Sequence, residues 1–184
     1  MGQPVFNQDQ MDAPDTEAPD TEAPDTQARY SAILPAPFGM VGVRVARGQV
    51  LELAYLPPGT PPLACDDALV QRVASQLDAY YANPDAAFDL PLAPLGSGFQ
   101  QRVWQAIRAV PRGATTTYGT IATSLQGTAR AVGQACGQNP FPVVVPCHRV
   151  VSARGVGGFS HHAEDGFFLD VKRWLLRHEG ALLL

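Results

Sequence analysis

A cysteine followed directly by a histidine and an arginine, Cys147-His148-Arg149, is the part of this sequence best suited to chemistry. A cysteine thiolate is a strong nucleophile, and nearby positive charge lowers the pKa of a thiol. We therefore expect the neighbours of Cys147 to lower its pKa. The alternative is a buried cysteine beside a surface histidine, because adjacent side chains in a strand point to opposite faces. The adjacency of the two residues does not by itself establish a nucleophile with its base.

The residues before Cys147 predict a rigid support for it. Residues 143–145 are three consecutive valines, which is typical of a strand buried on both faces. Pro142 and Pro146 cannot donate ladder hydrogen bonds, so pairing would be confined to the residues between them. We expect Cys147 to follow the end of this strand, where a reactive group is held in one place.

The net charge of −4 is unevenly distributed along the chain. Residues 1–29 hold seven acidic residues and one arginine, a net charge of −6, whereas residues 30–184 hold twelve basic and ten acidic residues, a net charge of +2. No Asp or Glu occurs from residue 90 to residue 163, a segment with six arginines. Its surface could approach phosphates without repulsion, which makes nucleic acid a candidate partner, with chance composition as the alternative.

The first 29 residues predict a disordered tail. They contain the repeat Ala-Pro-Asp-Thr-Glu twice, followed by Ala-Pro-Asp-Thr-Gln. A proline at every fifth position prevents a helix, and a segment with so few apolar residues cannot form a core. We expect an inert acidic extension, with competition for a basic surface as the alternative role.

Length and cysteine content restrict the class of protein. A chain of 184 residues can form one large domain or two small ones. No apolar run is long enough to span a membrane and the N-terminus lacks a signal-peptide pattern, so we expect a cytoplasmic, monomeric protein. Three cysteines without close spacing argue against a disulfide framework and against a metal site.

The first folded part, residues 30–93, predicts a small α/β unit. Apolar and β-branched residues at 41–45 and 50–56 predict two strands joined by a turn. Asp66 or Asp67 then caps a helix. The apolar face of that helix contains Leu69, Val73, Leu77 and Tyr80.

The second part, residues 94–184, predicts mostly helices. Ser97 and Gln100 form a capping-box pattern at the start of one helix, which ends before Pro111. Two short helices follow, the second of them capped by Thr128. Two helices joined by a short turn form a helix-turn-helix. These helices are expected at residues 118–125 and 129–137, and a last helix carries Phe168, Val171, Trp174 and Leu175 on its apolar side and ends at Gly180.

The helix that starts at Ala129 is unusual because most of its residues are small. Close packing against the core is one explanation. The other is that a smooth helix presses into a groove of nucleic acid, with Arg130 as its single long side chain.

The motif Pro146-Cys147-His148-Arg149-Val150, preceded by Asn139-Pro140, resembles the active-site signature of the O6-alkylguanine-DNA alkyltransferases, also called methylated-DNA–protein-cysteine methyltransferases. This core is highly specific. The resemblance extends from about residue 80 to the C-terminus and, more weakly, from about residue 38. The supporting stretches are Phe88-Asp89-Leu90-Pro91-Leu92, Phe99-Gln100, Val103-Trp104, Thr117-Tyr118-Gly119, Ala129-Arg130-Ala131-Val132-Gly133 and Trp174-Leu175-Leu176-Arg177-His178-Glu179-Gly180.

The resemblance implies an α+β fold, with a small N-terminal α/β domain of ribonuclease H-like type at 30–93 and a mostly helical, winged-helix-like domain with a helix-turn-helix at 94–184. It implies DNA repair by direct transfer of an alkyl group, typically methyl, from O6-alkylguanine in double-stranded DNA to Cys147. The base would be flipped out of the duplex, and O4-alkylthymine is a further candidate substrate. The thioether product has no easy leaving group, so each molecule would act once, without a cofactor.

The resemblance also assigns roles to single residues. Cys147 attacks, and His148 accepts its proton directly or through a water. Glu179 orients the imidazole. Asn139 organises the site, and Tyr118 donates a proton or hydrogen bond to the departing guanine. The expected DNA contacts are Thr128, Ala129, Arg130, which fills the gap left by the flipped nucleotide, and Arg149. The expected pocket residues are Cys136, Val150, Phe159 and Ser160, with the carbonyls of Val150 and Cys147 holding the amino group of the base.

The sequence departs from the family pattern at three places. The loop from Ser160 to Lys172 lacks the usual Gly-Gly pair and is about six residues longer. Two adjacent histidines of this loop, His161 and His162, are too few ligands to predict a metal site. The turn between the two short helices is shorter by roughly two residues, and Cys136 stands where relatives often have a larger apolar residue. We expect these departures to affect the range of alkyl groups accepted and the docking of DNA.

Two other functions are conceivable for a protein with this cysteine and histidine. A protein that binds alkylated DNA without repairing it would lack the nucleophilic cysteine, so Cys147 disfavours it. A hydrolase with a Cys-His-Glu arrangement would need an oxyanion hole and would turn over repeatedly. The acid-free segment and the helix-turn-helix favour DNA as the partner over that hydrolase.

Overall fold

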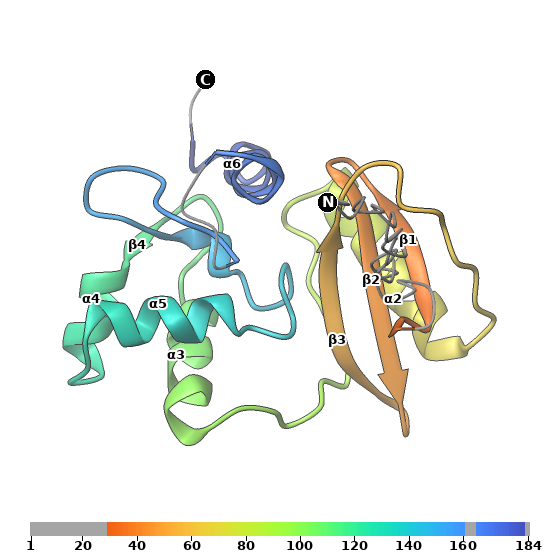
Figure 1. Ribbon diagram of the computed structural model, residues 1–184, viewed down its shortest axis with the longest axis horizontal. Coiled ribbons are helices and arrows are strands. Elements are labelled where there is room, and N and C mark those ends of the chain that lie inside the picture. Colours follow the sequence, from red (N-terminus) through yellow and green to blue (C-terminus); the bar gives the residue numbers. More distant parts are fainter. Residues whose placement is uncertain (1–28, 161–164, 183–184) are drawn as a thin grey trace, which may run out of the picture.

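The computed structural model describes residues 29–160 and 165–182, and every structural statement below refers to these residues. The predicted disordered tail and the pair His161 and His162 lie outside them. A sheet with one helix forms one side of the molecule, and the remaining helices form the other (Figure 1). Among the described residues, no helix is both long enough and apolar enough to cross a membrane.

The sheet is antiparallel, in the order β1 (Ala32–Ala36), β2 (Gly39–Ala46) and β3 (Gln49–Leu56). The two strands expected at 41–45 and 50–56 are confirmed as β2 and β3. The sequence did not predict β1, a short strand that contains a proline. A proline is tolerated there because β1 lies at the edge of the sheet.

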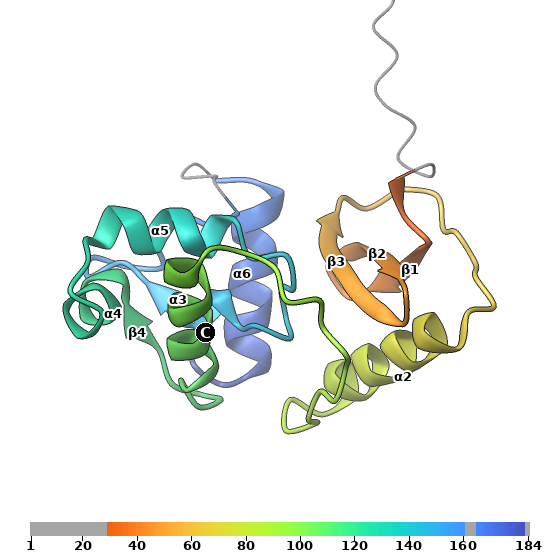
Figure 2. The same ribbon diagram turned by 90° about the horizontal axis from the view of Figure 1, so that it is seen from below.

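Helix α2 (Ala68–Ala82) packs against the sheet, as the view from below shows (Figure 2). Its cap is Asp67, whose side chain accepts a hydrogen bond from the backbone N–H of Leu69 at 2.7 Å. Val73 and Leu77 are buried on its apolar face. The capped amphipathic helix predicted from the sequence is therefore confirmed.

Helix α3 (Gly98–Arg108) begins with the predicted capping box between Ser97 and Gln100. Trp104 lies on its buried face and donates a hydrogen bond from Nε1 to the backbone oxygen of Ala135 at 2.8 Å. Because Ala135 belongs to α5, this bond fixes α5 across α3.

Helices α4 (Tyr118–Ser124) and α5 (Ala129–Gly137) are joined by a short turn, as predicted. Thr128 caps α5 and accepts a hydrogen bond from the backbone N–H of Ala131 at 3.2 Å. In this turn, Gly127 lies against the ring of Phe99. A Cβ added to Gly127 would be 3.2 Å from a carbon of that ring, so there is little room for a side chain. One side of α5 is buried in the protein, and its first residues are exposed.

The prediction of a strand at residues 143–145 is wrong, because this segment forms a turn before Cys147. Val143 has a positive φ of 71°, and the N–H of Val145 bonds to the backbone oxygen of Phe141 at 2.8 Å. Asn139 closes the turn, accepting from the N–H of Phe141 at 3.0 Å and donating to the backbone oxygen of Val145 at 2.9 Å. Prolines at 140, 142 and 146 remove the N–H groups that a strand ladder would need.

A single 3₁₀ turn, η1 (Cys147–Arg149), follows this turn and leads into strand β5 (Val150–Val151). Strand β5 pairs in parallel with β4 (Thr116–Thr117), which lies directly before α4. The segment that carries the cysteine and the start of the helix-turn-helix are thus joined by backbone hydrogen bonds.

Helix α6 (Phe167–His178) ends at Glu179, and Gly180 follows with a positive φ of 73°. The expected helix end is therefore confirmed, with glycine one position beyond the cap residue. Trp174 of this helix packs edge-on against Phe38, with 5.4 Å between the ring centroids. Aromatic packing thus joins α6 to the part of the molecule that contains the sheet.

Candidate active site around Cys147

Cys147 is a buried thiol held by the turn that precedes it. Its residue is 6% exposed, and Nδ2 of Asn139 donates a hydrogen bond to its sulfur at 3.4 Å. The same Nδ2 holds the backbone oxygen of Val145. The positive φ of Val143 and the side chain of Asn139 therefore fix the position of the sulfur together.

His148 and Glu179 form a fully buried pair next to Cys147. Nε2 of His148 lies 3.0 Å from Oε1 of Glu179, and both side chains are inaccessible to solvent. This contact is close but not aligned as a hydrogen bond, and Nδ1 of His148 has no partner within the described part of the chain. A proton on Nε2 facing the carboxylate leaves Nδ1 as the nitrogen that can accept a proton.

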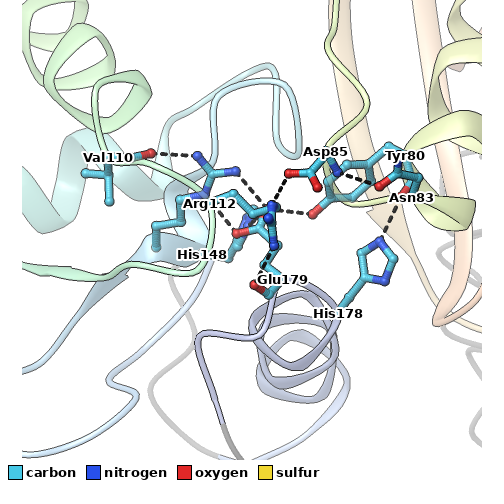
Figure 3. A network of polar contacts seen from close by, with 9 residues as sticks. Tyr80, Asn83, Asp85, Val110, Arg112, His148, His178 and Glu179 are labelled. Carbon is cyan, nitrogen blue, oxygen red and sulfur yellow. Dashed lines mark hydrogen bonds and ion pairs between the residues drawn. The ribbon is translucent and has the colours of Figure 1, made fainter.

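Glu179 is the centre of a polar network that joins both sides of the molecule (Figure 3). Tyr80 of α2 donates its hydroxyl to Oε1 at 2.8 Å. Arg149 binds both carboxylate oxygens, from Nε and Nη2, at 2.8 Å each. His178 adds a contact from Nε2 to the backbone oxygen of Tyr80 at 2.7 Å. The carboxylate is thereby fixed opposite His148.

The network corrects the assignment of Arg149 as a DNA contact. Its third donor, Nη1, bonds to the backbone oxygen of Val110 at 2.6 Å, and its side chain is only 14% exposed. All three donor groups are therefore used inside the protein. The buried carboxylate of Glu179 required a cation, and Arg149 supplies it.

Burial keeps the proton on the sulfur in the resting site. Burial raises the pKa of Cys147, against the lowering effect of the Asn139 hydrogen bond and the charge of Lys172. Burial lowers the pKa of His148, against the effect of Glu179. Burial alone would raise the pKa of Glu179, but its contact with His148 and its bonds from Arg149 hold that pKa well below the ordinary value. The resting site thus contains a neutral thiol, a neutral imidazole and a carboxylate.

The expectation that the sequence neighbours of Cys147 give it a lowered pKa is therefore wrong for the resting protein, because burial outweighs the nearby charge of Lys172. Burial is the largest influence on the thiol, and Arg149 is turned toward Glu179 instead. The sequence shows which residues are adjacent but does not show how deeply the sulfur is buried.

Lys172, expected only as the end of the long loop, lies in the site. Its ammonium is buried and donates to the backbone oxygens of Val150, Val156 and Gly158 at 2.8, 2.7 and 3.0 Å. Burial lowers its pKa to about 8, and the charge of Cys147 opposes that shift. A lysine on the apolar face of α6, between Val171 and Leu175, was the available signal.

Replacing Lys172 by methionine is expected to slow any reaction of the Cys147 thiolate about tenfold or more. The change removes the nearby positive charge, and a rise of one unit in the thiol pKa lowers the thiolate population tenfold. It also leaves three loop carbonyls without their donor. The rate of Cys147 alkylation at pH 7 measures the effect. Arg173→Met, on the same helix but paired with Asp165 and Asp170 at the surface, should react like the unaltered protein.

The predicted pocket residues differ in how many contacts connect them with the region of the Cys147 thiol. Tyr118 donates its hydroxyl to the backbone oxygen of Gly158 at 3.0 Å. Burial raises its pKa, with smaller contributions from Cys136 and Cys147. Burial also raises the pKa of Cys136 to about 12, with Cys147 again contributing. Cys136 and Cys147 are buried in the same core, and Tyr118 packs against it.

Three other predicted pocket residues belong to the loop after Cys147. The Val150 carbonyl already accepts a bond from Lys172, which leaves one of its two lone pairs. Phe159 is buried, with its ring 5.6 Å from the Lys172 ammonium. Ser160 has a positive φ of 50° and lies at the edge of the described part of the loop.

The predicted DNA contacts at the start of α5 are exposed. Thr128, Ala129 and Arg130 all lie at the surface, and Arg130 has no ion pair among the described residues. The N-terminal end of α5 thus presents a free guanidinium beside unpaired backbone N–H groups, an arrangement suited to a phosphate backbone.

Comparisons with known protein sequences agree with this site. A family described as "6-O-methylguanine DNA methyltransferase, DNA binding domain" matches residues 98–181. The methylated-DNA–protein-cysteine methyltransferase of Methanosarcina acetivorans is 37% identical over 161 residues, which are 83% of this chain and 99% of that protein. The enzyme of the same name from Salmonella typhimurium is 45% identical over 116 residues, 61% of this chain and 64% of that one.

Solved structures show the same arrangement of elements. The crystal structure of Mycobacterium tuberculosis O6-methylguanine methyltransferase superimposes with a TM-score of 0.67 at 34% identity, covering 81% of this chain and 91% of that one. Mycobacterium tuberculosis OGT in complex with DNA gives the same TM-score and coverage at 35% identity. The mixed fold of helices and a small antiparallel sheet is therefore shared with these enzymes.

Proposed function

Because this chain belongs to the family of methylated-DNA–protein-cysteine methyltransferases, we propose that it repairs DNA by moving the alkyl group of O6-alkylguanine to the sulfur of Cys147. Suicide stoichiometry is characteristic of this family, in which the enzyme is consumed by its own reaction. The observation that carries the proposal is the buried sulfur of Cys147 beside the His148–Glu179 pair.

In the proposed reaction the sulfur attacks the alkyl carbon, so an S–C bond forms as the C–O bond to guanine breaks. The thiol proton passes to Nδ1 of His148, and Glu179 balances the resulting imidazolium through Nε2. Arg149 and Tyr80 hold the carboxylate in place. Guanine leaves with the electron pair of the C–O bond and receives a proton or hydrogen bond from Tyr118.

The proposed substrate reaches this buried sulfur as a nucleotide flipped out of the duplex. The pocket assignments for Cys136, Val150, Phe159 and Ser160 belong to this proposal. Their support is the position of the first three beside the Cys147 region. O4-alkylthymine is proposed as a further substrate of the same pocket.

Arg130→Ala is expected to weaken binding to a short DNA duplex about tenfold at low salt. The guanidinium is exposed and without an ion pair among the described residues, so it is available to the DNA. Fluorescence anisotropy with a labelled duplex measures the affinity. Arg47→Ala removes an equally exposed arginine from the turn between β2 and β3 and should leave the affinity within twofold of the unaltered protein. Equal losses in the two variants would contradict a DNA-binding role for α5.

Intact-protein mass spectrometry after mixing with a duplex that carries one O6-methylguanine tests the proposed function. The expected result is a gain of one methylene mass on the peptide that contains Cys147, with uptake ending at one equivalent. Binding without a change in mass would instead support the alternative, a protein that recognises alkylated DNA without repairing it. If the protein neither binds this duplex nor takes up the methyl group, the proposal is overturned.

The finer structural assignments are also proposals. We propose a division into residues 1–29, 30–93 and 94–184, with a ribonuclease H-like N-terminal domain and a winged-helix-like C-terminal domain. The separate placement of the sheet and of helices α3 to α6 supports the boundary near residue 93 (Figure 1). Action as a monomer in the cytoplasm is proposed on the sequence pattern alone.

A further inference from the structure

The sheet reaches the active site through strand β3. The backbone N–H of Leu53 bonds to the backbone oxygen of Pro140 at 2.8 Å, so β3 is attached to the turn that holds Cys147. Two residues further along the same face, Tyr55 is only 6% exposed. Its ring lies 5.6 Å from that of Phe159 and 5.4 Å from that of Phe38. A phenol of the sheet is thus buried against the loop that follows Cys147.

The hydroxyl of Tyr55 is buried and has no hydrogen-bond partner among the described residues. Nδ1 of His148 is also buried and has no hydrogen-bond partner among the described residues. Buried polar groups normally have partners, and an unpartnered one calls for an explanation such as a catalytic role or an ordered water. Two such atoms near one nucleophile can share a single explanation.

The ring contact with Phe159 and the bond from Leu53 to Pro140 bring Tyr55 toward the segment that carries Cys147, and the electrostatic effects on its hydroxyl agree. Burial is the largest cause of its raised pKa, and the next is the charge of Cys147, followed by smaller effects that include Glu179. The phenol therefore stays protonated and can donate a hydrogen bond at any pH at which the protein works. Its interaction with the sulfur is strongest when the sulfur is an anion.

We propose that Tyr55 is a positioning residue for alkyl transfer, whose hydroxyl and the Nδ1 atom of His148 hold between them the water through which Cys147 loses its proton. The S–H bond breaks as the water takes the proton, and the water passes one of its own protons to Nδ1. Tyr55 donates a hydrogen bond to the water oxygen throughout and keeps its proton. This inference rests on the proposed function.

Tyr55→Phe tests the inference because it removes one oxygen and keeps the ring that packs on Phe159. Tyr81→Phe is the matched control, since the Tyr81 hydroxyl is also buried without a partner among the described residues. Burial and the charge of Asp78 raise the pKa of Tyr81, whereas the charge of Cys147 contributes to the raised pKa of Tyr55. Both variants should keep melting temperatures close to that of the unaltered protein, because each loses one hydroxyl that bonds to no described residue and keeps its ring.

The expected result is a fall of about tenfold in the single-turnover rate of methyl transfer for Tyr55→Phe, with unchanged affinity for DNA. Its rate–pH profile should move to higher pH by about half to one pH unit, because the water that takes the thiol proton loses the hydrogen-bond donor that positions it. Tyr81→Phe should keep the original rate and profile. A Tyr55→Phe protein whose rate and profile match those of Tyr81→Phe overturns the inference and leaves the proposed function intact. Failure of the unaltered protein to take up methyl overturns both.

Discussion

Replacing Cys147 by alanine is expected to abolish methyl uptake completely while leaving binding to methylated DNA in place. The sulfur is the only group of the proposed mechanism that forms a bond to the alkyl carbon, and alanine has no nucleophile. The exposed residues at the start of α5 are untouched by this change, so the affinity for DNA should stay within a few fold. Transfer of radioactive methyl from labelled DNA to protein, with anisotropy on the same duplex, measures both quantities.

Cys65→Ala provides the control for this experiment. Cys65 is a free thiol outside the site, and its backbone oxygen, which bonds to Gln71 Nε2, is preserved in the variant. This variant should take up one equivalent of methyl at the original rate. Methyl uptake that survives the loss of Cys147 would show that another residue is the acceptor and would reject the mechanism.

Replacing Glu179 by glutamine is expected to cause the largest loss of stability among the single changes considered, together with a fall of about 100-fold or more in the transfer rate. The carboxylate is buried and accepts from Tyr80 and from two nitrogens of Arg149. Without its charge, the guanidinium of Arg149 is left largely buried and uncompensated. Breaking a buried pair in this way costs about 3–5 kcal/mol of unfolding free energy.

The fall in rate has a separate cause from the fall in stability. An amide in place of Glu179 cannot balance the imidazolium that His148 becomes when it accepts the thiol proton. Urea unfolding gives the free energy, and single-turnover transfer at a temperature where both proteins are folded gives the rate. Asp85→Asn is the control, because Asp85 pairs with Arg112 at the exposed edge of the same network and should lose less than about 1 kcal/mol. Similar losses for the two variants would argue against a central role for Glu179.

The pH dependence of stability offers a second test of Glu179. Its contacts hold its pKa in the folded protein below the ordinary value of 4.5. The stabilisation is therefore fully present above about pH 4.5 and is lost as the pH falls toward the folded pKa. The unfolding free energy of the unaltered protein should decrease on acidification in this range. Glu179→Gln should lack this part of the decrease, and parallel pH curves for both proteins would contradict the assignment.

Local sequence patterns were sufficient for most of the helices and strands. The capping box at Ser97 and the caps at Asp67 and Thr128 depend on a few neighbouring residues, and each is present as expected. Strands β2 and β3 likewise follow from apolar and β-branched residues around a turn. The short strand β1 was missed because its pairing with β2, rather than its own composition, stabilises it.

The valines before Cys147 show where a local pattern is misleading. Three consecutive β-branched residues predict a strand, but a strand requires a partner for its backbone groups. The surrounding prolines cannot supply donors, and the side chain of Asn139 provides partners within a turn instead. The positive φ of Val143 is tolerated because these contacts fix the turn.

The sequence by itself determined the family and predicted the nucleophile with its neighbouring histidine, because the residue types and their spacing carry that information. Only the tertiary structure decided that Arg149 faces Glu179, that Lys172 is buried beneath the loop, and that Tyr55 of the sheet is buried against Phe159. The physical reason is that burial and the pairing of charges depend on residues distant in the chain. The pKa of Cys147 is raised by its burial, which is a property of the folded protein.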